Sequence, residues 1–89
     1  MHHADVLADV ARRVALLNEF RTDDFQDRVV RMVNDARENW RKDGELPRFG
    51  TDASYDALVS IASVADSSPI AVRDACAVAL DESEARAAR

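Results

Sequence analysis

Few residues of this 89-residue chain have the types and spacing that covalent chemistry needs. The single cysteine, Cys76, lies in an apolar run, which predicts a buried thiol with no base beside it. The two histidines, His2 and His3, are neighbours near the amino terminus and do not have the spacing of a metal site. Gly44 and Gly50 stand apart, so there is no glycine-rich phosphate-binding loop. We therefore expect no enzymatic activity, no metal ion and no cofactor.

The overall charge and the absence of long apolar runs argue against nucleic acid and membranes as the main partners. The chain has 17 acidic and 12 basic residues, with a formal net charge of −5, which is the wrong sign for a protein that mainly holds a phosphate backbone. No apolar run approaches the roughly 18 residues of a membrane span, and no basic segment followed by an apolar one predicts a secretory signal. One cysteine allows no internal disulfide, which favours the cytoplasm.

The most basic stretch of the chain interleaves arginines with aromatic residues. Tryptophan and arginine are enriched at the energetic centres of protein interfaces, so this stretch predicts a partner-binding surface. Nucleic acid stacked on the tryptophan is a second interpretation. The third is structural, because the tryptophan continues an apolar helical stripe and cations are common at the carboxyl ends of helices. The candidate partner-binding residues are Arg37, Trp40, Arg41, Arg48 and Phe49.

A second candidate site lies within residues 58–80. The stretch 61–75 has small residues in a first helix, a serine that caps a second helix, and apolar residues that would pack back. This stretch resembles the helix-turn-helix unit of lac-repressor-type regulators. The resemblance implies that the second helix enters the major groove of DNA. By position, the implied DNA-binding residues are Ser68, Ile70 and Arg73.

The alternative interpretation of residues 61–75 is an ordinary helical corner. Asp66 and Ser67 stand where that family has a glycine and an apolar residue. Residues 51–89 carry seven acidic residues against three arginines, a poor surface for phosphate. Both interpretations place the same two helices next to each other.

The elements that must position these residues are all helical. Apolar residues recur at helical spacing in four segments, and no segment alternates as a strand does. We predict an all-α fold, a small compact bundle of four helices at about 4–20, 23–43, 52–65 and 69–86, in a single domain 1–89.

Capping residues predict where these helices begin and end. Thr22 is the expected N-cap of the second helix, and Gly44 is expected just beyond its end in a left-handed conformation. Ser68 followed by Pro69 is typical of a helix start. Residues 81–89 are expected to fray. Of the loop residues, Leu46 and Phe49 are expected to fold back onto the core.

A chain of this length buries only about 60 % of its unfolded surface, so self-association would help to stabilise it. These features predict a non-catalytic protein–protein interaction module that forms a homodimer. A small accessory protein or a phage-encoded modulator of a host protein fits this description. The alternative function is a DNA-binding transcriptional regulator that uses residues 58–80.

Overall fold

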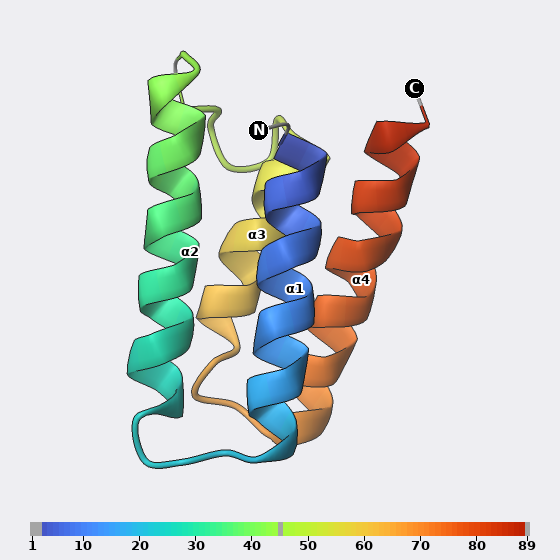
Figure 1. The fold of residues 1–89 in the computed structure, drawn as a ribbon. Helices are drawn as coiled ribbons and strands as arrows, with labels where there is room; N and C mark the ends of the chain where they lie inside the picture. Colours follow the sequence, from blue (N-terminus) through green and yellow to red (C-terminus); the bar gives the residue numbers. More distant parts are fainter. Residues whose placement is uncertain (1–2, 45, 89) are drawn as a thin grey trace.

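A computed structural model describes residues 3–44 and 46–88, and this part of the chain forms a bundle of four helices (Figure 1). The helices are α1 (His3–Glu19), α2 (Phe25–Lys42), α3 (Ala53–Ser63) and α4 (Pro69–Ala87), and successive helices alternate in direction. The Cα radius of gyration is 12.2 Å, close to the roughly 12 Å of a compact domain of this length. The predicted all-α bundle is confirmed. None of the described helices is long and apolar enough to cross a bilayer.

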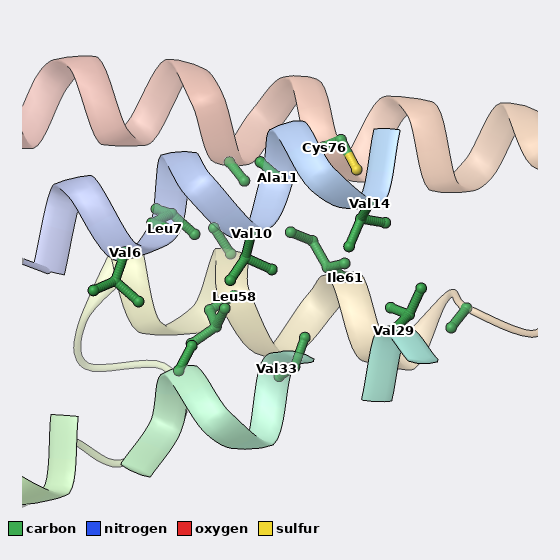
Figure 2. Close-up of a cluster of buried hydrophobic side chains, with 14 of the residues drawn as sticks. Val6, Leu7, Val10, Ala11, Val14, Val29, Val33, Leu58, Ile61 and Cys76 are labelled. Carbon is green, nitrogen blue, oxygen red and sulfur yellow. The ribbon is translucent and has the colours of Figure 1, made fainter. Parts of the chain in front are cut away.

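The helices α1 and α3 form the middle of the bundle, because each of them contacts the other three. The helices α2 and α4 flank this pair, and apolar side chains from all four fill the space between them (Figure 2). The fully buried side chains at the centre include Leu7, Val14, Val29, Val33, Leu58, Ile61, Val72 and Cys76.

The contact between α1 and α4 is built from small residues. Ala4, Ala8 and Ala11 of α1 are buried, and the Ser83 hydroxyl of α4 donates a 2.7 Å hydrogen bond to the Ala4 carbonyl. Small side chains let two helix backbones approach closely, and Figure 2 shows Ala11 and Cys76 at this contact. The prediction that residues 81–89 fray is therefore wrong as far as Ala87, because Ser83 and its neighbours are fixed against α1.

The start of α2 differs from the prediction. The helix begins at Phe25, so its N-cap is Asp24 rather than Thr22, and the Asp24 side chain makes no capping hydrogen bond. The Thr22 hydroxyl instead donates to the Asp24 carboxylate, and the Thr22 carbonyl accepts from the Phe25 N–H in a turn that precedes the helix. The hydroxyl lowers the pKa of Asp24. This local bond occupies the capping groups of both residues.

The remaining helix ends follow the predicted caps more closely. Ser68 accepts a hydrogen bond from the Ala71 N–H, with Pro69 in the first turn of α4. Asp52, where the third helix was predicted to begin, is the N-cap of α3 and accepts from the Tyr55 N–H. Gly44 follows α2 with a positive φ of 149°, which is beyond the left-handed helical region that we predicted. The helix α3 ends at Ser63, two residues before the predicted Ala65.

Candidate partner-binding surface

The residues predicted to bind a partner lie toward the end of the bundle that is uppermost in Figure 1. There the start of α1, the carboxyl ends of α2 and α4, and the start of α3 come together. We call this end the tryptophan end, defined by His3, Trp40, Tyr55 and Arg86. Its side chains join all four helices, so the candidate surface is attached to a rigid base rather than to one isolated helix.

Trp40 lies inside this base. Its side chain is buried at 2 % exposure, with the His3 ring stacked on it at 4.1 Å and Tyr55 meeting it edge-on at 6.1 Å between ring centroids. An indole at this depth cannot make the direct contact with a partner that the sequence suggested. The structural interpretation of Trp40, as an anchor of the core, is the one that the burial supports. Its effect on any partner would pass through the residues packed on it.

His3 is a member of the tryptophan end that sequence analysis missed. Its Nε2 atom lies 3.2 Å from Asp43 Oδ2, and its Nδ1 atom lies 3.4 Å from Arg86 Nη2. The sequence contained a signal for this position, because the buried stripe of α1 begins at the next residue, Ala4. No role is predicted from the sequence for either histidine, and His2 lies outside the described part of the chain.

Arg86 connects His3 to the start of α3. Its Nη1 atom lies 3.2 Å from Asp52 Oδ1, and Asp52 also caps α3 through the Tyr55 N–H. Partial burial opposes ionisation of Asp52, but the hydrogen bonds from Tyr55 and Arg86 outweigh it and lower the pKa of this carboxyl group. The ionised Asp52 therefore holds α3 and α4 together.

Arg37 is half-buried on α2 and is held by one hydrogen bond. Its Nε–H donates to the Tyr55 hydroxyl at 2.9 Å, and its Cζ atom lies 5.9 Å from the centroid of the Tyr55 ring. Within the described residues, its two Nη groups donate to no other group. The bond to Tyr55 thus holds the Nε side of the guanidinium in place, and the described residues leave the two Nη groups able to donate to a ligand.

The side chain of Arg37 opens onto a shallow recess of about 290 Å³. Arg41 is exposed there and pairs with Glu38, with 3.1 Å between Arg41 Nη2 and Glu38 Oε1. Leu46, from the following loop, packs partly against the core, as predicted. The residues that line the recess are Asn34, Arg37, Glu38, Arg41 and Leu46.

The loop after α2 carries the other two candidates. Arg48 is exposed, and Phe49 is 66 % exposed, so the prediction that Phe49 folds back onto the core is wrong. The loop is nevertheless tied to α3, because the Gly50 N–H donates to Asp56 Oδ1 at 2.8 Å. Gly50 has a φ of 94°, a backbone conformation that favours glycine and directs the chain into this contact.

The residues of the helix-turn-helix interpretation lie at the opposite end of the bundle, where α4 begins. Ile70 is 62 % exposed, and Arg73 is exposed with its Nε atom 3.9 Å from Asp74 Oδ1. Ser68 is engaged in capping. Carboxylates follow Arg73 on the exposed part of α4, namely those of Asp74, Asp81 and Glu84.

The groups that we considered for chemistry are not assembled into a site within the described residues. Burial raises the pKa of the Cys76 thiol to about 11, which keeps it protonated and unreactive at neutral pH. No cluster of three or more histidine, cysteine or carboxylate side chains able to hold a metal ion occurs in the described part of the chain. No protein-family model matches the chain, and neither the curated proteins nor the solved structures show a significant similarity to it.

Proposed function

We propose that this chain is a non-catalytic protein-binding module that contacts its partner through an arginine surface formed by Arg37, Arg41, Arg48 and Phe49. The observation that carries the proposal is the exposure of Phe49, at 66 %, on a loop that is tied to α3 through Gly50 and Asp56. Burying such an aromatic side chain against a partner contributes roughly 1.5–3 kcal/mol, and the fixed loop lowers the entropy that binding would otherwise cost.

The distance between the loop and the recess is short. Phe49 follows Leu46 by three residues, so its Cα atom lies within about 11 Å of a residue that lines the recess. An exposed aromatic ring beside arginine side chains is the composition typical of interface centres. The tryptophan end supports this surface from behind, because Arg37 is bonded to Tyr55 and Tyr55 packs on Trp40.

Charge supports the choice of an acidic partner. The chain carries a net charge of −5, so a local group of arginines is the part of it that an acidic protein would approach with least repulsion. Such complementarity sets orientation and association rate more than affinity. We therefore expect the arginines to determine where the partner docks and Phe49 to stabilise the complex.

The test is affinity capture from a lysate of the source organism, quantified by mass spectrometry. The site variant carries Arg37→Glu, Arg41→Glu and Arg48→Glu. The matched control carries Arg12→Glu, Arg13→Glu and Arg73→Glu, which makes the same charge change at exposed positions outside the surface. Circular dichroism must show equal helicity for both variants.

The proposal expects proteins that the wild type and the control variant retain and the site variant loses. It is contradicted if the site variant retains every protein that the wild type retains. Phe49→Ser should lower the capture of the same proteins while leaving their identity unchanged.

The wild type, the site variant and one further variant, Arg73→Ala, are used to examine the remaining proposals. Light scattering reports whether the chain forms the homodimer suggested by its size, and whether the site variant changes that state. Anisotropy with mixed-sequence duplex DNA examines the helix-turn-helix alternative, in which Arg73→Ala should abolish binding.

A buried, protonated thiol at Cys76 suits the reducing cytoplasm that we propose as the compartment.

A further inference from the structure

The recess on α2 contains one arginine whose hydrogen-bonding capacity is only partly used. Arg37 donates through Nε to the Tyr55 hydroxyl, and its two Nη groups have no acceptor among the described residues. A guanidinium presents parallel N–H groups that match the two oxygens of a carboxylate. Because Tyr55 already holds the side chain, little conformational freedom would be lost when an anion binds.

The charges around the recess favour an anion with a single charge. Glu38 lies 3.1 Å from Arg41 and compensates most of its charge, so Arg37 is the uncompensated cation among the residues that line the recess. Asn34 also lines the recess, and its exposed amide supplies a further N–H donor. One cation and one neutral donor match the single charge of a carboxylate, whereas one charge of a phosphate dianion would stay uncompensated.

The remaining wall of the recess is apolar. Leu46 lines it from the loop and packs partly against the core, so it presents a fixed hydrocarbon surface next to Arg37. We propose that this recess binds the carboxylate of a single acidic side chain of the partner protein, with the carbon atoms of that side chain against Leu46. This inference rests on the proposed protein-binding function and defines which chemical group of the partner the surface recognises.

The experiment is an NMR titration of the ¹⁵N-labelled chain at constant ionic strength. The probe is sodium hexanoate, which combines a carboxylate with a short apolar chain. The comparison probes are 1-hexanol, which lacks the charge, and inorganic phosphate, which has the wrong charge and no apolar part. The signals read are the Arg37 Nε–H and the Asn34 side-chain amide.

Hexanoate should shift both signals along a saturable curve, and hexanol should not. Arg37→Gln should weaken hexanoate binding by at least about tenfold, the factor expected for loss of a charge-assisted pair. Arg31→Gln, which removes an exposed arginine of α2 that does not line the recess, should leave the binding unchanged. Tyr55→Phe should weaken it a few-fold, because the positioning bond to Arg37 is lost.

Three results would overturn the inference. These are an Arg37 signal that hexanoate leaves unmoved, a tighter binding of phosphate than of hexanoate, and an equal loss in Arg31→Gln and Arg37→Gln. None of these results decides the lysate capture, which depends on Arg41, Arg48 and Phe49 as well. The partner can therefore dock on the arginine surface even if the recess takes no carboxylate, and the two failures are distinguishable.

Discussion

Arg21 and Arg37 both lie against an aromatic ring, at opposite ends of the bundle, but the fold uses them differently. Arg21 donates through Nε to Asn18 Oδ1 and through Nη1 to the Ser67 carbonyl, each at 2.9 Å, and its Cζ atom lies 4.4 Å from the centroid of Phe25. Its Nη2 atom is buried and has no hydrogen-bond partner among the residues that the structure describes. Arg37 donates, within the described part of the chain, through Nε alone, and its side chain lines a recess.

The role of each arginine therefore depends on how many of its N–H groups are already hydrogen-bonded within the fold, and not on the aromatic ring beside it. Arg21 joins the end of α1 to the turn before α4, a connection that Asn18 reinforces through its bond to the Pro69 carbonyl. Arg21 is a structural residue, because its Nε and Nη1 donors bond to the chain and its Nη2 atom is buried. Arg37 has a similar aromatic neighbour, yet the edge that recognises carboxylates stays open.

The largest effect is expected at Trp40, which holds the tryptophan end together. Trp40→Ala should lower the free energy of unfolding by about 3–5 kcal/mol, because a fully buried aromatic is lost together with its stacking on His3. Urea denaturation measures this change. Phe49→Ala is the matched control at an exposed aromatic, and it should change stability by no more than about 0.5 kcal/mol. Equal losses in the two variants would show that the tryptophan end is not the rigid base described above.

Urea denaturation should also show that Arg21 contributes more to the free energy of unfolding than Arg37 does. Arg21→Gln should cost about 1–3 kcal/mol, since it removes two hydrogen bonds to the chain and the contact with Phe25. Arg37→Gln should cost less than about 1 kcal/mol, because a single bond to Tyr55 is lost. If Arg37→Gln is the more destabilising variant, Arg37 is the structural residue and the comparison is inverted.

Acid should weaken the tryptophan end through Asp52. The pKa of Asp52 is lower in the folded chain than the 3.8 of the unfolded chain. The ionised carboxylate therefore stabilises the fold fully at pH values well above 3.8, and this stabilisation is lost as the pH falls through the folded-state pKa. Asp52→Asn keeps an oxygen that accepts from the Tyr55 N–H but removes the charge paired with Arg86, so it should lower the free energy of unfolding by no more than about 1 kcal/mol at pH 7 and by less at pH 3. The acceptors of Arg21 are amide oxygens that do not titrate, so the loss in Arg21→Gln should be similar at both pH values. An undiminished loss in Asp52→Asn at pH 3 would contradict this account.

The helices themselves could be predicted because their signals are local. Apolar residues at helical spacing predicted all four helices. Serine followed by proline predicted the residue at which α4 begins. The start of α2 was misplaced because Thr22 and Asp24 bond to each other, which a list of good capping residues does not reveal. The docking of residues 81–87 was missed since it depends on Ala4, which is far away in the sequence.

The candidate site was predictable only in part for the same reason. The sequence identified the arginines and Phe49 and gave a buried Trp40 as one interpretation, but it could not decide between burial and partner contact, because the stacking partners His3 and Tyr55 come from other helices. Nor could it show that Arg21 bonds to the Ser67 carbonyl and Arg37 to the Tyr55 hydroxyl, because both bonds join residues far apart in the sequence. The recess needs Leu46 from the loop, and this contact is equally nonlocal.

The most direct test of the arginine surface uses two exposed phenylalanines at opposite ends of the bundle. Phe20 is 76 % exposed near Arg21, and Phe49 is 66 % exposed beyond the recess of Arg37. Each is replaced in turn by the photo-crosslinking residue p-benzoylphenylalanine, and crosslinked products formed in the lysate are identified by mass spectrometry. We predict a partner adduct from position 49 and none from position 20. An adduct from position 20 alone would contradict the account and place the binding surface at the opposite end.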